Sequence, residues 1–104
     1  MVIVLFRTKL REGADRKAYG ELAGQLLGIA EAMPGFVSFD SYRNRDDETL
    51  SVVVFESDEA REAWRVQPDH LEAQRRGREE FYESYSFEVT TLEHGRTWDH
   101  GGSS

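Results

Sequence analysis

The sequence has 104 residues, with 13 basic and 20 acidic side chains, a formal net charge of -7 and no cysteine. A chain of this length supports one domain with a modest hydrophobic core. The negative charge argues against nucleic acid or an anionic membrane surface as a partner. The lack of cysteine excludes disulfides, a thiol nucleophile and a cysteine-ligated metal. We therefore expect a small organic molecule or another protein as the partner, and the cytoplasm as the compartment.

The first part of the chain predicts a strand followed by a long helix. Residues 2–9 begin with a nearly continuous apolar run, which predicts a buried strand. The run has no basic segment before it and no cleavage site after it, so it does not resemble a signal peptide, and it is too short to cross a bilayer. From Asp15 to Met33 apolar residues recur every three or four positions, as in an amphipathic helix. Asp15 is the expected N-cap, and Pro34 with Gly35 ends the helix.

The middle of the chain predicts a hairpin. Residues 36–43 read as a second strand, residues 44–48 as a polar turn, and residues 49–56 as a third strand. Val37 and Phe39 are expected on one face of the second strand. The third strand is apolar on both faces, so we expect both of its faces to be buried.

Two helices and a last strand are expected after the hairpin. Ser57 is a suitable cap for a short helix that ends at about Val66. Pro68 interrupts the helical pattern, and the stretch Asp69–Glu72 has the form of a capping box that starts another helix, which runs to about Tyr82. Alternating apolar residues over 84–93 then predict the fourth strand.

This order of elements predicts an α+β fold with the ferredoxin-like split βαβ plan, in which a four-stranded antiparallel sheet carries its helices on one face. The other face keeps apolar side chains from the first and third strands. Pairing two sheets face to face would bury them, so a homodimer is expected. Residues 1–93 form the predicted domain. Residues 94–104 are rich in Gly and Ser and are expected to form a loose tail.

Over residues 1–93 the chain resembles the antibiotic biosynthesis monooxygenase (ABM) domain family of the dimeric α+β barrel superfamily. The resemblance rests on Pro34-Gly-Phe36, Val54-Phe-Glu56, Ala63-Trp64, His70 and Phe81. It implies that two sheets pair into a dimeric α+β barrel. Some members of the family oxidise anthrones or quinols to quinones with dioxygen and neither metal nor flavin, whereas others degrade haem.

The resemblance implies a cofactor-independent monooxygenase that acts with dioxygen on a small aromatic or quinol-like substrate, with no metal. His70 lies in the first turn of its expected helix, where the helix dipole favours a neutral imidazole that can accept a proton. Trp64 could supply an aromatic wall and an indole donor. The plain structural alternatives are a surface histidine and a tryptophan that packs the helix onto the sheet.

Three further residues are candidates for substrate binding. Tyr42 and Asn44, at the end of the second strand, could orient a hydroxyl group of the ligand. Arg7 interrupts the apolar first strand and could hold a substrate anion. The alternatives are ordinary strand-end residues and an ion pair at the rim of the sheet.

Two other functions are possible for the same fold. One is a non-catalytic module that binds a small molecule or serves as a dimeric interaction domain. The other is haem binding or degradation, which the sequence favours less. Haem-degrading relatives combine an Asn in the first strand with a widely spaced Trp and His. Here the first strand carries Arg7, and His70 follows Trp64 by only six residues.

Overall fold

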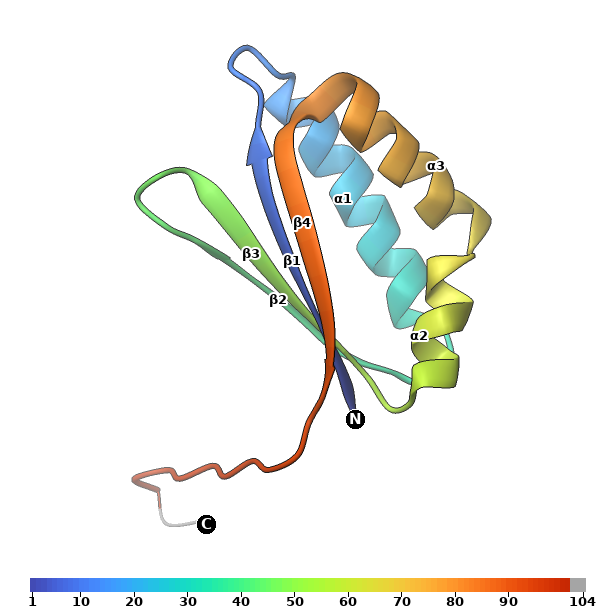
Figure 1. Cartoon of the computed structure of the whole chain (residues 1–104), viewed down its shortest axis with the longest axis vertical. Helices are drawn as coiled ribbons and strands as arrows, with labels where there is room; N and C mark the ends of the chain where they lie inside the picture. Colours follow the sequence, from blue (N-terminus) through green and yellow to red (C-terminus); the bar gives the residue numbers. More distant parts are fainter. Residues whose placement is uncertain (102–104) are drawn as a thin grey trace.

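The computed structural model of the chain describes residues 1–101. In chain order its elements are β1 (Val2–Leu10), α1 (Arg16–Glu31), β2 (Phe36–Arg43), β3 (Glu48–Phe55), α2 (Asp58–Arg65), α3 (Pro68–Arg76), the π-helical turn η1 (Gly77–Phe81) and β4 (Tyr82–Thr91). The predicted order of strands and helices is confirmed (Figure 1).

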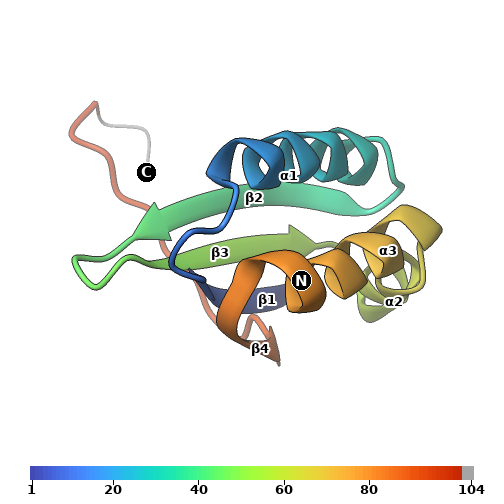
Figure 2. The same ribbon diagram turned by 90° about the horizontal axis from the view of Figure 1, so that it is seen from above.

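The four strands form one antiparallel sheet in the order β2-β3-β1-β4. The helices lie together on one side of this sheet, with α1 beside β2 (Figure 2). The chain therefore has the predicted α+β, ferredoxin-like fold. Its edge strands are β2 and β4.

The register of the strands assigns side chains to the two sides of the sheet, because directly opposed residues of an antiparallel pair share a side. Phe6 lies opposite Phe87. The Phe6 ring also contacts Tyr82 at 6.0 Å between centroids, and Tyr82 contacts Tyr19 of α1 at 5.9 Å. Phe6 and Phe87 therefore lie on the side that faces the helices.

The opposite side of the sheet, which we call the open face, carries apolar side chains from the two central strands. Leu5 lies opposite Val52, and Ile3 lies opposite Val54. These side chains are only partly buried in the single chain. The prediction that an apolar face is left without helices is confirmed. The open-face row consists of Ile3, Leu5, Leu50, Val52 and Val54.

The core lies between the sheet and the helices. Phe55 and Phe81 are each 2 % exposed, and Phe55 meets Phe36 edge to face at 6.3 Å. Gly35, with φ of 84°, connects α1 to β2 in a conformation that glycine adopts without strain. A Cβ at Gly35 would lie 2.5 Å from the Cβ of Ala60 in α2, so the close approach of helix and strand also requires glycine.

The starts of α1 and α2, at the Asp15 and Ser57 caps, agree with the sequence, and the start of α3 differs. Asp15 caps α1 as predicted, and its Oδ1 accepts a hydrogen bond from the Ala18 amide at 3.0 Å. The predicted capping box at the start of α3 is wrong. Gln67 is the N-cap, its side-chain oxygen accepts from the His70 amide at 2.9 Å, and Pro68 occupies the first turn. Proline suits this position because its fixed φ is already helical.

The end of α3 also differs from the prediction. The helix stops at Arg76, the chain continues as η1, and β4 begins at Tyr82, where the sequence predicted the end of the helix. The guanidinium of Arg11 donates to the backbone carbonyls of Arg78, Glu79 and Tyr82. These bonds satisfy carbonyls that no longer have partners within the helix, which stabilises the early transition to strand.

Beyond Thr91 the chain continues without regular structure to residue 101. The Leu92 amide still donates to the Met1 carbonyl at 3.0 Å, and the segment then leaves the sheet (Figure 1). Residues 102–104 of the predicted tail lie outside the described residues. Within the part of the chain that is described, no helix has the length and apolar character needed to cross a membrane.

Candidate functional site

The reversal of the chain between α2 and α3 brings two of the predicted residues into contact. Trp64 lies in the last turn of α2 and His70 in the first turn of α3. Their rings stack with centroids 4.5 Å apart and planes 28° from parallel. The Gln67 cap fixes the backbone at His70. The short spacing in the sequence therefore places the two rings side by side.

The environment of His70 favours a neutral imidazole with one defined tautomer. Burial lowers its pKa below the ordinary value, while the carbonyls of Arg65 and Trp64 act in the opposite direction. Its Nδ1 lies 3.4 Å from the Arg65 carbonyl, which can only accept a hydrogen bond. A proton on Nδ1 satisfies this contact and leaves the lone pair on Nε2. The direction agrees with the predicted neutral base, although burial is the main cause.

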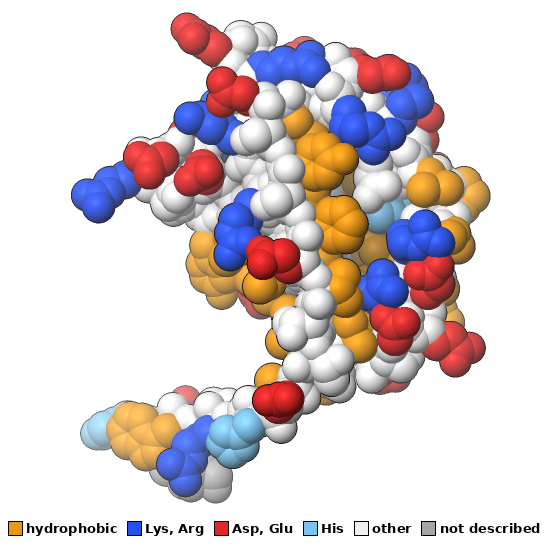
Figure 3. Space-filling model, in the orientation of Figure 1, with side chains coloured by type: hydrophobic (Ala, Val, Ile, Leu, Met, Phe, Trp, Pro, Cys, Tyr) orange, Lys and Arg blue, Asp and Glu red, His pale blue; other side chains and the backbone are white. Residues whose placement is uncertain are grey.

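An exposed hydrophobic strip lies on the helix-facing side of β4. We call it the β4 strip; it consists of Tyr85, Phe87 and Val89, and Phe87 is 58 % exposed. Figure 3 shows hydrophobic side chains along this strand. His70 belongs to α3, in the helix layer that this side of β4 faces.

The β4 strip continues inward as an aromatic cluster. Tyr85 contacts Phe6 at 5.9 Å and Tyr82 at 5.8 Å between ring centroids. Burial raises the pKa of the Tyr82 phenol, so this side chain stays neutral. Aromatic faces on the same side of the sheet as a neutral imidazole suit a flat aromatic ligand that loses a proton. The alternation of residues 85–89 predicted a strand, but the sequence alone did not mark it as part of a site.

The other three predicted residues come together elsewhere. Arg7 and Tyr42 both lie opposite Leu50, so they share the open face of the sheet. With Asn44 they line a hollow of about 280 Å³ at the β2–β3 turn. Tyr42 is 61 % exposed. The structure thus divides the five predicted residues between the two sides of the sheet.

Local partners already occupy the polar groups of Asn44 and Arg7 in this second cluster. Asn44 Oδ1 accepts from the amides of Asp46 at 2.9 Å and Glu48 at 3.0 Å, and its Nδ2 donates to Glu48 Oε1 at 3.1 Å. Asn44 therefore closes the turn in which Asp47 has φ of 63°. Arg7 forms an exposed ion pair with Glu88.

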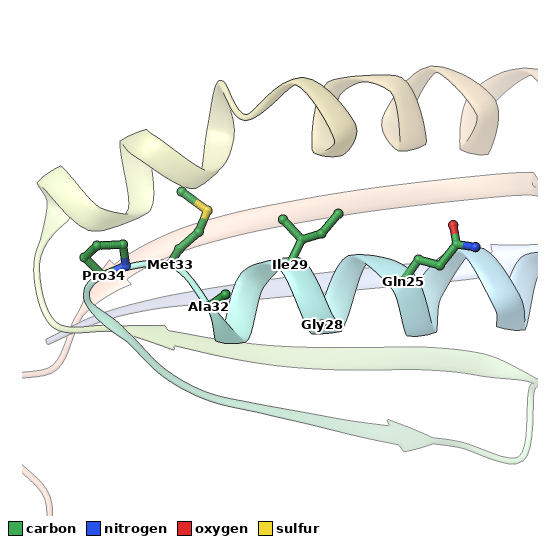
Figure 4. A pocket seen from close by; sticks show the side chains of 6 residues that line it. All are labelled: Gln25, Gly28, Ile29, Ala32, Met33 and Pro34. Atoms are coloured by element: carbon green, nitrogen blue, oxygen red, sulfur yellow. The ribbon is translucent and has the colours of Figure 1, made fainter.

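A third feature is a shallow, open apolar depression at the end of α1. We call it the α1 hollow; the residues that line it are Gln25, Gly28, Ile29, Ala32, Met33 and Pro34 (Figure 4). None of these side chains titrates, so the hollow offers a surface for packing and no acid or base. Within residues 1–101, no three His, Cys, Asp or Glu side chains are grouped so as to hold a metal ion.

Fold and site together define a small α+β protein of ferredoxin-like fold with a candidate proton acceptor and an exposed aromatic strand on the same side of its sheet. The family model for antibiotic biosynthesis monooxygenases matches residues 1–76, and the chain belongs to this family. Its match to "Uncharacterized protein YqjZ" of Bacillus subtilis (strain 168) is 33 % identical over 78 residues, which are 75 % of this chain and 68 % of that protein.

Solved structures confirm the fold at lower sequence identity. Rv0793 from Mycobacterium tuberculosis has a TM-score of 0.80 and 23 % identity, covering 92 % of this chain and 98 % of its own. SnoaB from Streptomyces nogalater, described as a cofactor-independent oxygenase, has a TM-score of 0.75 and 17 % identity, covering 90 % of this chain and 94 % of its own. At these sequence identities the similarity shows a shared fold, that is, the same arrangement of strands and helices.

Proposed function

We propose that this protein is a cofactor-independent monooxygenase that oxidises a small aromatic or quinol-like substrate with dioxygen. The substrate would lie between the β4 strip and the Trp64–His70 pair. The observation that carries the proposal is the neutral, stacked His70, whose Nε2 is free to accept a proton. Membership of the monooxygenase family supports it.

The proposed reaction is the conversion of a ring methylene to a ketone, with water as the second product. His70 Nε2 takes a proton from the substrate, and the resulting carbanion passes one electron to dioxygen. The substrate radical and superoxide combine to a peroxide, which takes the proton back from the imidazolium. Loss of a second C–H proton to His70 and of hydroxide from the O–O bond gives the ketone, and the imidazolium proton converts hydroxide to water. The substrate supplies all the electrons.

Trp64 acts through His70 in this scheme. Its indole covers one face of the imidazole, which keeps water away from the ring and holds the pKa of His70 low. On β4, the exposed side chains of Tyr85 and Phe87 provide surfaces on which a planar substrate can stack. Arg7, Tyr42 and Asn44 have no part in this step, because they lie on the other side of the sheet or in the turn.

We further infer that the protein works as a homodimer in which the open-face rows of two copies pack together. Such packing would remove partly exposed aliphatic side chains from water, and that burial is the usual driving force of stable association. The composition without cysteine fits a reducing compartment and supports a cytoplasmic protein.

Dioxygen uptake with a panel of anthrones and hydroquinones tests the proposal. His70→Ala should lower kcat by about 10²–10⁴-fold, the usual contribution of a positioned general base. Trp64→Phe keeps an aromatic plane and should reduce the rate less. Tyr42→Phe, on the open face, is the matched control and should retain the wild-type rate. Equal uptake by wild type and His70→Ala would contradict the role of the base.

The openness of the site gives one specific reason to consider a binding module instead. Phe87 is 58 % exposed, whereas catalysis requires that water be kept out when the substrate binds. Tight binding of an anthrone without any uptake of dioxygen would identify such a module.

Haem binding is the third alternative, and mixing the protein with haemin tests it. We expect no Soret shift on mixing, and a shift that is lost in His70→Ala would indicate a haem site.

A further inference from the structure

The segment after β4 carries an exposed tryptophan on an extended piece of chain. Trp98 is 72 % exposed and Leu92 is 44 % exposed. The ring of Trp98 touches that of His100 at 6.3 Å, but both residues lie outside the folded body (Figure 1). An exposed indole of this size is suited to bury itself in an apolar surface, because tryptophan is enriched among the residues that contribute most to binding at interfaces. We call residues 92–98 the arm.

The α1 hollow is an apolar surface of suitable chemistry. Ile29 and Met33 point from α1 toward the α2 side, and Pro34 closes the end (Figure 4). The Met33 thioether suits an indole, since sulfur and aromatic rings attract each other. Gly28 leaves open space, with no atom within 4 Å of the position a Cβ would take. Gln25 offers an amide oxygen at the rim for an indole N–H.

We propose that Trp98 of one copy seats in the α1 hollow of a second copy. The proposal rests on the homodimer inferred above, in which two open faces pack together. A two-fold axis parallel to the strands would place edge strand β4 of one copy beside edge strand β2 of the other and preserve the strand directions. In the sheet, Thr91, Val2, Phe55 and Phe36 lie in one line. The arm therefore starts at the end of the molecule where α1 passes into β2.

The length of the arm matches the distance to be crossed. Passing from one packed sheet to the next takes about 10 Å, and passing a helix adds about 10 Å. Seven extended residues reach about 23 Å. The arm, residues 92–98, has this length and no regular structure to shorten it.

The direction of the arm favours a second copy over the chain's own hollow. In Figures 1 and 2 the segment leaves β4 on the side of the sheet away from the helices, whereas the α1 hollow lies within the helix layer. To reach its own hollow the arm would have to reverse around the edge of its own sheet. Toward a partner packed on the open face, it continues in the direction it already has.

Trp98 fluorescence tests the contact when Trp64→Phe makes it the sole tryptophan of the full chain. In the dimer we expect emission at short wavelength and protection from acrylamide. Gly28→Gln fills the hollow and should shift the emission to long wavelength and restore quenching. Gly20→Gln is the matched control, because Gly20 lies on the same helix with open space around it but does not line the hollow. It should leave the emission unchanged.

Mixing two full-length variants separates contact with a second copy from contact within one chain. The first carries Trp64→Phe and Gly28→Gln, so its tryptophan finds its own hollow blocked. The second carries Trp64→Phe and Trp98→Ala, so it has an open hollow and no tryptophan. An excess of the second should shift the emission of the first to short wavelength. An unchanged spectrum would overturn exchange between copies.

Light scattering on the same samples separates the possible failures. A dimer whose Trp98 is fully quenched by acrylamide would overturn the seat in the α1 hollow and leave the dimer standing. A monomer would overturn both. Neither result bears on the proposed oxidation, because dioxygen uptake reports on His70 and the β4 strip independently.

Discussion

Gly77 of η1 lies directly against the ring of Tyr82 at the start of β4. A Cβ there would overlap the ring of Tyr82, which is held in place by Phe6, Tyr19 and Tyr85. We predict that Gly77→Ala lowers the free energy of unfolding by about 1–3 kcal/mol, the usual cost of overpacking. Urea denaturation followed by circular dichroism measures it.

Gly24→Ala is the control for this prediction. Gly24 also lies in a helix, but nothing is within 4 Å of its Cβ position. Alanine should therefore raise the free energy of unfolding by about 0.5–1 kcal/mol through helix propensity. If both variants raised the free energy of unfolding, the result would contradict the close packing of Tyr82 against Gly77.

The stacked indole makes a second prediction at the residue scale. Burial lowers the pKa of His70, and Trp64 supplies part of that burial. Trp64→Ala should expose the ring and raise its pKa toward the ordinary 6.5 or so, which NMR titration of the imidazole protons can follow. Trp98→Ala, remote from the ring, should leave the titration of His70 unchanged. A pKa of His70 that is the same in wild type and Trp64→Ala would contradict shielding by the indole.

The lowered pKa also fixes the sign of two pH effects. Neutral His70 is favoured in the folded chain, so the unfolded chain binds more protons as the pH falls below the ordinary value. The contribution to stability is complete above that value and is lost as the pH falls through the folded-state pKa. Oxidation that uses His70 as the base should decline through the same folded-state pKa, while Tyr42→Phe keeps this profile.

At the scale of elements, the sequence predicts the strands and helices whose formation depends on neighbouring residues in the chain. The strands follow from their apolar runs, and α1 follows from its periodicity and the Asp15 cap. The junction of α3, η1 and β4 depends on Arg11, which precedes the carbonyls it binds by about seventy residues. No sequence pattern near Arg76 indicates this long-range contact, so the predicted helix ended at about Tyr82 and not at Arg76.

In the candidate site, too, the sequence predicts the local contacts but not the side of the sheet on which a residue lies. Trp64 and His70 meet because the chain reverses between two short helices, a local event that Pro68 signals. Arg7 and Tyr42 share a side of the sheet, as strand alternation allows, but alternation does not tell which side receives the helices. The central strands are apolar on both sides, so only the packing of α1 settles it.

At the scale of the whole molecule, the apolar character of both sides of the central strands is the reason to expect that two copies associate. One apolar side of the sheet receives the helices, and the other keeps the open-face row in partial contact with water. The net charge of -7 keeps the chain soluble but opposes the approach of two copies at low salt. Dimerisation through this face should therefore strengthen as the salt concentration rises, because the interface is apolar and the repulsion is screened.

Val52 is the position at which we test that interface. It lies on the central strand β3, opposite Leu5, with its side chain on the open face. Val52→Lys should leave an unpaired ammonium group in the packed sheets, which costs several kcal/mol. A cost of about 3 kcal/mol raises the dissociation constant by roughly a hundredfold. Light scattering at micromolar concentration should then give the mass of one chain, where the wild type gives two.

Leu71→Lys is the matched control, because Leu71 is an exposed apolar residue of α3, on the helix side of the sheet. It should keep the dimeric mass, and circular dichroism should show that both variants are folded. A Val52→Lys protein that remains a dimer would exclude packing through the open face. The arm could then no longer reach a partner's α1 hollow by the route across the β2 edge, so the single mass measurement constrains both interfaces.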